Sequence, residues 1–524
     1  MDVQPPASRY LGALRNSQGR PFNQLLELRK KVPTYVWCSL FTALGGFLWG
    51  YDTGSIGPIS VMPQFEAQFG ALSPTAQGLL VSSILIAASI TSLVAGPLSD
   101  RISRTRTIAL GGAVFSAGCA IACSAQHRPQ LFIGRSIAGV GQGLFISSIT
   151  VYVTEISPSA SRGRLSTFVQ SFNTIGIMTG YFTCYGSVKV PGSFSWRFPL
   201  ALQAVVAIIL AVGTPFFPHS PRWLRHVGRH RDVDEAKRRL GIAGTNATGD
   251  DLNSQDTNIT GPSGHFAQDL KNLWGKGIRT RTIFCVFIMA MQPLSGIDAV
   301  LYYAPTLFSQ AGLSSTTSSF LASGVSGILM VLVTLCSQWF QDKWSRRVQQ
   351  IGGSAICALA MLIIGAIYLS HSNSTEPGRT TIICFIYIFV AGFVSSWAIV
   401  TRIVCNEVQP TKTRAAVSSL SQCANWVVNC VVAFSTPLFL DRSSWGPYFL
   451  FGGCSLLNAA VCFVFQPETK GLTLEAIDSG LDDTPFQSAL RRRIGNLRNR
   501  SNNTNGGGDE SSATAIELVE APLR

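Results

Sequence analysis

The sequence DRISR at residues 100–104 recurs as DKWSR at residues 342–346, and each copy directly follows a long apolar stretch. Two more charged patterns occur twice in the same order: Glu155 with Arg162 and Glu407 with Arg414, then PHSPR at 218–222 and PETKG at 467–471. Internal repeats of this kind are typical of membrane proteins made of two related halves. The repeats therefore predict two equivalent membrane-embedded halves with their charges at one end.

The composition places most of the chain in a membrane. Of the 524 residues, 47% are hydrophobic and 13% are charged, and the mean hydropathy is +0.28. A helix of about 20 apolar residues crosses a bilayer core. Stretches near this length lie at 35–57, 76–97, 107–126, 129–155, 163–186, 198–217, 281–309, 317–340, 349–369, 379–408, 412–440 and 446–465. The sequence thus predicts an all-α membrane protein with twelve transmembrane helices in two pseudo-symmetric six-helix bundles.

These stretches divide the chain into five predicted parts. They are a cytosolic N-terminal segment (1–34), a first six-helix bundle (35–217), a cytosolic linker with short helices (218–280), a second bundle (281–465) and a cytosolic, mostly disordered tail (466–524). The charged stretch 232–240 predicts one of the linker helices. The tail is polar and poor in apolar residues, which disfavours a packed core.

Basic residues cluster on one side of the predicted bundles, for example at Arg101, Arg104 and Arg346. The positive-inside rule places this side and both termini in the cytosol. The net charge of +14 is then explained by topology and by anionic lipid, so we expect membrane lipid as a partner and no nucleic acid. We expect a multi-pass protein of the plasma membrane, acting as a monomer.

Nearly all of the 13 cysteines fall within predicted spans, which argues against a disulfide framework, and we expect no metal or other cofactor. Among the Asn-x-Ser/Thr sequences, only the one at Asn373 falls on the predicted outer side. Asn373 is therefore the expected glycosylation site.

A series of short motifs runs in order through residues 35–480. They include GYDTG at 50–54, Gly134-Arg135, WRFP at 196–199, SPRWL at 220–224, Gln292 with SGI at 295–297, Tyr302-Tyr303, and Asn425-Trp426 with Asn429. Together with the repeated charged patterns, these motifs resemble the sugar porter family of the major facilitator superfamily, including its fungal members. The resemblance covers the whole membrane domain and implies the major facilitator fold.

The resemblance also implies a solute site between the two halves, near the middle of the membrane. The matching positions are Gln170, Gln292, Asn425, Trp426, Asn429 and Trp49, where Trp49 stands in place of the family's usual phenylalanine. A hydroxylated solute exchanges its hydrogen bonds to water for bonds to side-chain amides, and its C–H face packs on an aromatic ring. The alternative is that these amides only bond neighbouring helices.

Asp52 and Arg135 form the sharpest predicted pair. A carboxylate in the middle of an apolar span is costly unless it is paired or protonated, and Arg135 in the fourth span is its expected partner. A change in their separation would load or release a proton. Proton-coupled family members resemble this chain in having Asp here, whereas passive facilitators commonly have Asn. A purely structural salt bridge is the alternative.

The charges at one end match positions that hold the family's two halves together in one state. They are Glu155, Arg162, Arg101 and Arg104 in the first half and Glu407, Arg414, Asp342 and Arg346 in the second, and we add Tyr302 and Tyr303 as gating residues. Simple topogenic charge is the alternative. This chain departs from the family pattern here, with Ser103 where glycine is usual, Thr105 where arginine is usual and His219 where glutamate is usual.

Three departures affect the predicted site itself. Pro293 replaces a second glutamine, Asp298 replaces the usual Asn, and Arg402 lies where the family's Gly-Pro-x-Pro-Trp sequence ends. The lost prolines and glycine predict a straighter tenth helix. We expect an Asp298–Arg402 ion pair between the seventh and tenth helices that recognises a carboxylated or other polar non-hexose solute. The alternative is that Arg402 extends towards the membrane boundary.

The most consistent interpretation is a secondary active transporter that works by alternating access. Its partners would be protons and a small-molecule solute, most simply a sugar, a related polyol or a sugar acid. An exporter of a specialised metabolite with the same fold is the first alternative, and a nutrient sensor that does not transport is the second. An enzyme is disfavoured, because no nucleophile, base and oxyanion-binding group converge in the sequence pattern.

Overall fold

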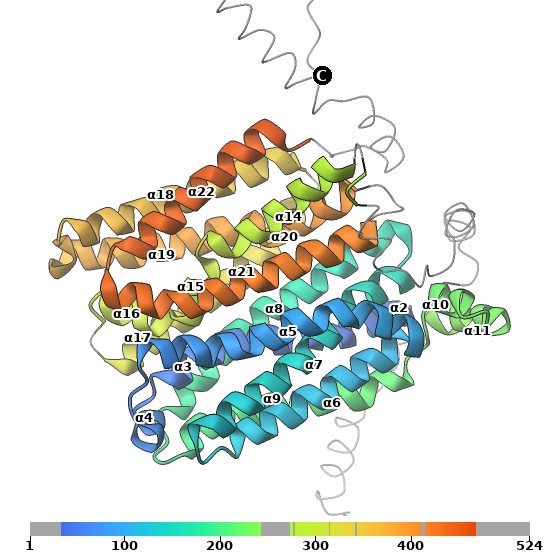
Figure 1. Cartoon of the computed structure of the whole chain (residues 1–524), viewed down its shortest axis with the longest axis horizontal. Helices are drawn as coiled ribbons and strands as arrows, with labels where there is room; N and C mark the ends of the chain where they lie inside the picture. The colour runs from blue at the N-terminus through green and yellow to red at the C-terminus, as the bar shows by residue number, and fades with distance from the viewer. Residues whose placement is uncertain are drawn as a thin grey trace, which may run out of the picture. The chain divides into compact units, whose positions relative to one another are not determined.

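The computed structural model describes residues 33–242, 273–275, 278–313, 315–340, 343–409 and 414–467. In these residues the regular structure is helical throughout (Figure 1). The long apolar helices bury their surfaces by packing against other helices of the chain. The all-α prediction is confirmed for this part of the chain.

The N-terminal half begins with two short helices in line and continues through long antiparallel helices. Its helices are α2 (Thr34–Thr42), α3 (Leu44–Ser60), α4 (Pro63–Phe69), α5 (Pro74–Ile102), α6 (Arg104–Cys123), α7 (Arg128–Ile156), α8 (Ser159–Ser187), α9 (Phe194–Gly213), η1 (Thr214–Phe216), α10 (Pro221–His226) and α11 (His230–Leu240). Local sequence sets the starts: Ser73 caps α5 by accepting from the Ala76 amide at 3.2 Å, and proline follows in the first turn.

The C-terminal half repeats this plan with more interruptions. Its helices are α14 (Ile278–Leu294), α15 (Ile297–Tyr302), α16 (Ala304–Gln310), α17 (Thr316–Phe340), α18 (Arg346–Leu369), η3 (Ser372–Ser374), α19 (Glu376–Ser395), α20 (Trp397–Glu407), α21 (Arg414–Arg442) and α22 (Gly446–Phe465). Ser345 caps α18 and Thr375 caps α19 through their hydroxyl oxygens. These two hydroxyl caps fix the starts of α18 and α19.

Ten helices in the described residues are long and apolar enough to cross a membrane. The two remaining predicted spans, 35–57 and 163–186, are also helical but fall short for different reasons. The first is divided between α2 and α3, and the second is α8, a 29-residue helix rich in polar residues. A polar helix at this length must face other helices rather than lipid, which points to α8 as a lining element of the centre.

The two halves meet through equivalent pairs of helices. In Figure 1, α5 of the N-terminal half lies alongside α21, and the contacts confirm this pairing as well as that of α8 with α17. Helix α3 also approaches α15 so closely that a Cβ on Gly57 would lie 1.7 Å from the Tyr302 carbonyl oxygen. The absence of a side chain at Gly57 therefore allows backbone contact between the halves.

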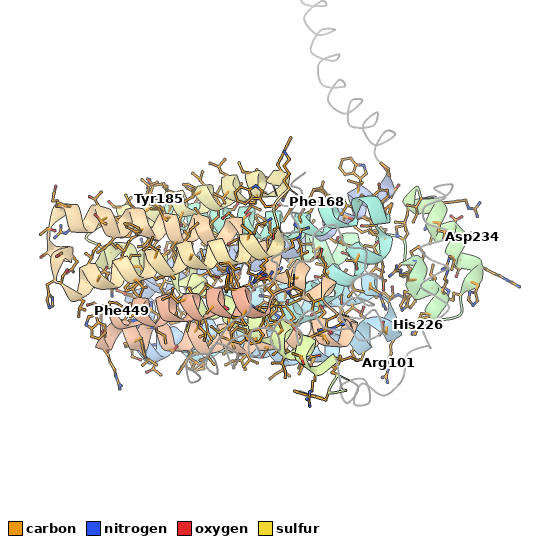
Figure 2. The ribbon with its side chains drawn as sticks, turned by 90° about the horizontal axis from the view of Figure 1, so that it is seen from above. Arg101, Phe168, Tyr185, His226, Asp234 and Phe449 are labelled. Carbon is orange, nitrogen blue, oxygen red and sulfur yellow. The ribbon has the colours of Figure 1, made fainter. Side chains whose placement is uncertain are left out.

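Helices α10 and α11 lie at the end of the N-terminal half where α5 and α6 join. Figure 2 shows Arg101, His226 and Asp234 toward this end, with Tyr185 and Phe449 toward the other. The Trp223 indole donates to the Asp100 carbonyl at 2.8 Å and ties α10 to the α5–α6 turn. We name this end, which carries Asp100, Arg104 and Glu155, the charged end.

The predicted seventh span at 281–309 is not a continuous helix. It breaks after α14, where Gly296 adopts a φ of +94°, and α15 and α16 continue from there. A Cβ on Gly296 would lie 2.6 Å from the Phe451 ring, so both the backbone angle and the packing require glycine. Pro293 in the last turn of α14 assists the break.

The prediction of a straighter tenth helix is wrong. The chain leaves helical geometry at Ser396 (φ −127°, ψ −74°), between α19 and α20, although 379–408 contains no proline. The neighbouring α18 explains this break. The Trp397 indole donates to the Gln350 carbonyl (3.1 Å) and the Ser354 hydroxyl (2.8 Å) of α18. Ser396 meanwhile donates back to the Gly392 carbonyl, which competes with the helical hydrogen bonds.

Candidate functional site

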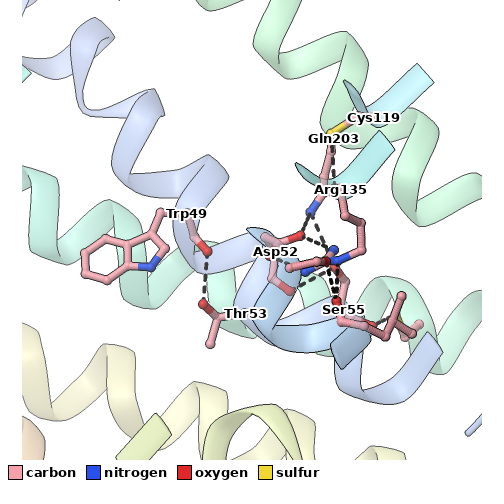
Figure 3. A network of polar contacts seen from close by, with 10 residues as sticks. Trp49, Asp52, Thr53, Ser55, Cys119, Arg135 and Gln203 are labelled. Carbon is pink, nitrogen blue, oxygen red and sulfur yellow. Dashed lines mark hydrogen bonds and ion pairs between the residues drawn. The ribbon is translucent and has the colours of Figure 1, made fainter. Parts of the chain in front are cut away.

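The Asp52 carboxylate and the Arg135 guanidinium form a two-point ion pair between α3 and α7. The two N–O distances are 2.9 and 3.2 Å (Figure 3). The third guanidinium nitrogen, Arg135 Nε, donates to the Leu80 carbonyl of α5 at 2.8 Å. Asp52 is 3% exposed and Arg135 2%. Burial makes both charges costly on their own, so each is retained by the other and by the surrounding hydrogen bonds.

Gln203 completes this network from α9. Its amide donates to Asp52 Oδ1 at 3.3 Å and approaches the Ser55 hydroxyl at 3.5 Å, while its own oxygen accepts from the Cys119 thiol (Figure 3). The sequence reasoning missed Gln203. The available signal was a single amide within the apolar span 198–217, whereas Gln170 and Gln292 were predicted from the family resemblance.

A second cluster, which we name the central cluster, contains Trp49, Gln170, Arg402 and Trp426. The Trp49 and Trp426 rings lie 5.4 Å apart between their centres, and the Arg402 guanidinium lies 5.2 Å from the centre of the Trp49 ring. Arg402 also donates to Gln170 Oε1 at 3.5 Å. Helices α3 and α8 of one half and α20 and α21 of the other thereby meet through polar and aromatic side chains.

Gln292 and Asn425 lie together in the C-terminal half. The Asn425 amide donates to Gln292 Oε1 at 3.0 Å and to the Met289 carbonyl at 2.9 Å. Gln292 donates in turn to the Trp397 carbonyl at 3.3 Å, next to the break between α19 and α20. These two predicted residues therefore link α14, α20 and α21 at the point where the backbone is interrupted.

Asp298 and Asn429 are neighbours, with the Asn429 side chain hydrogen-bonded to the Asp298 carboxylate. The predicted Asp298–Arg402 ion pair is not formed. In the described ranges, no carboxylate oxygen lies within 4.0 Å of the Arg402 guanidinium, and the two residues interact only electrostatically at longer range. The reason is that Arg402 turns across the interface towards Trp49 and Gln170 rather than towards α15.

At the charged end, Arg104 pairs with both Glu155 and Asp100 within the N-terminal half. The distances are 3.0 Å to Glu155 Oε1 and 2.6 Å to Asp100 Oδ1, and Arg104 also donates to the Ser99 carbonyl. Arg101 is exposed. Arg346 begins α18 and Glu407 ends α20. The side chains of Arg162, Arg414 and Asp342 lie outside the described residues, so the expectation that these charges hold the two halves together in one state stays a prediction.

The turn at the charged end brings together the three residues that depart from the family pattern there. Ser103 has a φ of +100° and ψ of 148°, a conformation that favours glycine. Its hydroxyl hydrogen-bonds to Nδ1 of His219 at 2.8 Å, and Thr105 bonds the same nitrogen at 3.1 Å. Desolvation, helped by the nearby cations Arg106 and Arg229, lowers the pKa of His219 below its usual 6.5.

At the opposite end, a tyrosine of the N-terminal half bonds the C-terminal half: the Tyr181 hydroxyl of α8 donates to the Leu301 carbonyl of α15 at 2.5 Å. Within the C-terminal half, the Tyr303 hydroxyl donates to the Ala433 carbonyl of α21 at 2.7 Å. Tyr302 is 1% exposed and its carbonyl faces Gly57. These contacts bring the predicted gating residues Tyr302 and Tyr303 into the interface.

The remaining predicted features lie away from the centre. Asn373 lies in η3, between α18 and α19, at the end of the molecule opposite the charged end. In the described part of the chain every cysteine is free, and no group of three or more His, Cys, Asp or Glu residues is placed to hold a metal ion.

Two sets of long helices that meet through a buried layer of amides, aromatic rings and an arginine, with a buried charge pair inside the first set, define a membrane transporter of the major facilitator type. The family model described as "Sugar (and other) transporter" matches residues 38–481. The chain therefore belongs to the sugar transporter family, and it is a multi-pass membrane protein.

Known relatives support this assignment along nearly their full length. The glucose transporter GlcP of Staphylococcus epidermidis is 31% identical, over 83% of this chain and 95% of its own. The low-affinity glucose transporter HXT4 of Saccharomyces cerevisiae is 28% identical, over 87% of this chain and 83% of its own. The proton:xylose symporter XylE of E. coli, solved with 6-bromo-6-deoxy-D-glucose, has a TM-score of 0.69 and 25% identity and covers 85% of this chain and 98% of its own.

Proposed function

We propose that the protein is a proton-coupled symporter of a sugar or related polyhydroxylated solute, working by alternating access. The observation that carries this proposal is the position of the buried Asp52–Arg135 pair beside the central cluster, where the two halves meet. The named activities of the relatives, which include glucose transport and proton–xylose symport, support the solute class.

The solute would bind where amides and aromatic rings come from both halves. Gln170 and Trp49 belong to the N-terminal half, and Gln292, Asn425 and Trp426 to the C-terminal half. Amides supply donors and acceptors for hydroxyl groups, and indole faces pack against C–H groups. Because the solute would contact both halves, it could stay bound while the halves change from one arrangement to the other.

The proton would be carried by Asp52. Trp49 precedes Asp52 by one turn of α3, and the Trp49 backbone carbonyl accepts from the Thr53 hydroxyl at 3.1 Å (Figure 3). A displacement of Trp49 by solute or by Trp426 would therefore move α3 at the position of Asp52. Loosening the ion pair with Arg135 favours protonation of the carboxylate, and tightening it favours release.

The available driving force is sufficient for uptake. One proton crossing a potential of 100 mV supplies about 2.3 kcal/mol, which corresponds to a roughly 50-fold solute gradient at about 1.4 kcal/mol per tenfold. With the charged end in the cytosol, as the basic residues indicate, the contact of Tyr181 with Leu301 and that of Gly57 with Tyr302 would close the outer end.

Reconstitution of the full chain tests this proposal. Purified protein in liposomes would be supplied with radiolabelled D-glucose, D-xylose, D-sorbitol or D-gluconate, at external pH 5.5 and 7.5 with internal pH fixed at 7.5. We expect accumulation of at least one solute at pH 5.5 and only equilibration at pH 7.5. Equal uptake at both pH values would exclude proton symport, and proton-driven efflux from loaded liposomes would identify an exporter.

A further inference from the structure

Arg402 occupies an unusual position for a basic residue. It lies on α20 of the C-terminal half, and its guanidinium crosses to the N-terminal half, over the Trp49 ring and beside Gln170. An arginine that extends to the membrane boundary would contact the charged end instead. Arg402 contacts the residues of the central cluster, so its charge belongs to the centre of the molecule.

The hydrogen-bonding capacity of Arg402 is mostly unused by the protein. A guanidinium has five N–H donors, yet among the residues that the structure describes Arg402 donates a single side-chain hydrogen bond, of 3.5 Å, to the neutral amide oxygen of Gln170. Its Nε is buried and has no hydrogen-bond partner, and within the described residues it forms no ion pair. Arg135, in contrast, has a carboxylate on one side and a carbonyl on the other.

A second unused group lies on α21. Asn429 is 2% exposed, and its side-chain oxygen is buried without a hydrogen-bond partner. Asn429 follows Trp426 by less than one helical turn, and it bonds Asp298, which interacts electrostatically with Arg402. An unpaired buried acceptor costs free energy, and a hydroxyl group of a solute would satisfy it.

We propose that this protein selects a polyhydroxylated carboxylate, of the sugar-acid class, and that Arg402 binds its carboxylate group. This inference rests on the proposed transport function and specifies the solute of the same site. The planar guanidinium suits two parallel hydrogen bonds to a carboxylate. Hydroxyl groups would bond Gln170 and Asn429, and the carbon chain would lie on Trp49.

The charges nearby decide how such an anion is tolerated. Asp298 lies beyond ion-pair distance of Arg402, and Asp52 is already paired with Arg135. A carboxylate on Arg402 therefore does not displace an existing partner. The solute carboxylate would pair with the Arg402 guanidinium, while Asp298 stays with Asn429. The site therefore accepts one negative charge close to Arg402 and disfavours a second.

A matched pair of solutes tests this proposal. D-gluconate and D-sorbitol have six carbons and similar hydroxyls, and they differ in the carboxylate. Binding to the purified full chain would be measured by isothermal titration calorimetry, and uptake in liposomes, for wild type, Arg402→Gln and Arg402→Lys. Arg347→Gln serves as the control, because Arg347 of α18 lies against the Phe463 ring of α22, away from the central cluster.

We expect wild type to bind D-gluconate at least about tenfold more tightly than D-sorbitol, as hydrogen bonds to a charged group predict. Arg402→Gln should abolish this preference while D-sorbitol affinity stays within about threefold. Arg402→Lys should retain part of the preference, because its charge remains but the two-point geometry is lost. Arg347→Gln should behave as wild type.

The outcomes separate this inference from the function on which it rests. Binding and uptake of D-sorbitol or D-glucose without a preference for D-gluconate would overturn the inference and leave the transport proposal intact. Unchanged D-gluconate affinity in Arg402→Gln would do the same. Absence of binding and uptake for every solute, with monodisperse protein, would overturn both. If Arg402→Gln does not fold, the wild-type preference and Arg402→Lys still decide.

Discussion

The Arg135 guanidinium and the Asp52 carboxylate share two hydrogen bonds, of 2.9 and 3.2 Å, and both residues belong to the N-terminal half. The pair therefore does not itself hold the two halves together. Its separation must be driven from elsewhere, and α3 supplies the connection because it carries Trp49 one turn before Asp52. In the proposed mechanism, solute contact at Trp49 and proton binding at Asp52 would be linked through this single helix.

Asp52→Asn should uncouple transport from the proton gradient. The amide keeps a hydrogen-bond acceptor for Arg135 but carries no charge and does not titrate. We expect concentrative uptake at an imposed gradient of one pH unit, worth about tenfold in accumulation, to fall to equilibration. Exchange of labelled for unlabelled solute should persist. Uptake into liposomes with and without the gradient measures both quantities.

The control for this substitution is Glu66→Gln, which removes an exposed carboxylate from α4. It should accumulate solute as wild type does. Asp52→Asn also leaves the Arg135 charge buried without a counter-ion, which lowers stability by a few kcal/mol, so thermal melting must accompany the assay. Full accumulation by a folded Asp52→Asn protein would show that Asp52 does not carry the proton.

The sequence was sufficient to predict the helical membrane fold and the Asp52–Arg135 contact, because burial forces a lone acid and a lone base together. It was not sufficient for Gln203, whose role depends on which face of α9 points at Asp52. The prediction of an Asp298–Arg402 ion pair was wrong for a similar reason. Opposite charges on facing helices predict attraction, but the rotamer of Arg402 directs it to Trp49 instead.

The tenth span shows a further limit of sequence patterns. Proline and glycine signal helix breaks, and their absence from 397–402 predicted a straight helix. The break at Ser396 instead comes from α18, through hydrogen bonds from Trp397 to Gln350 and Ser354. Contacts between segments that are distant in sequence decide such a feature, and no local pattern contains them.

Asn373 should carry the N-linked glycan when the chain is made in a eukaryotic secretory membrane. The residue lies in the short η3 helix between α18 and α19, opposite the charged end, where Arg379 donates to its carbonyl. We expect Asn373→Gln to remove the mobility shift produced by endoglycosidase treatment. Asn246→Gln and Asn258→Gln, on the predicted cytosolic side, should leave that shift intact. A shift lost only in those two variants would reverse the proposed orientation.

His219 should make folding stability depend on pH near the charged end. Because desolvation, Arg106 and Arg229 lower its folded-state pKa, while Asp232 opposes them, the unfolded chain takes up the proton first as pH falls. The contribution of His219 is therefore fully present above about pH 6.5 and is lost as the pH falls below that value. Thermal melting in detergent between pH 5.5 and 8 measures this dependence.

The matched variant for His219 is His219→Gln, which keeps a hydrogen-bond acceptor for Ser103 and Thr105 without a titrating group. Its melting temperature should fall less than that of wild type between pH 7 and pH 5.5. An identical decline in both proteins would assign the pH dependence to other groups. A steeper decline in His219→Gln would contradict the direction of the pKa change.

Gly57→Ala should prevent the two halves from closing at the end opposite the charged end. The new methyl group would lie 1.7 Å from the Tyr302 carbonyl oxygen, which is backbone and has little room to move. Gly96→Ala provides the control, because Gly96 is an exposed residue of α5 and a Cβ there meets nothing within 4 Å. We expect Gly57→Ala to reduce the uptake rate at least about tenfold, because conformational steps of this kind limit many catalytic cycles. It should also accelerate amide hydrogen exchange in 297–303. Normal uptake and unchanged exchange in Gly57→Ala would show that the contact between Gly57 and Tyr302 is not part of the transport cycle.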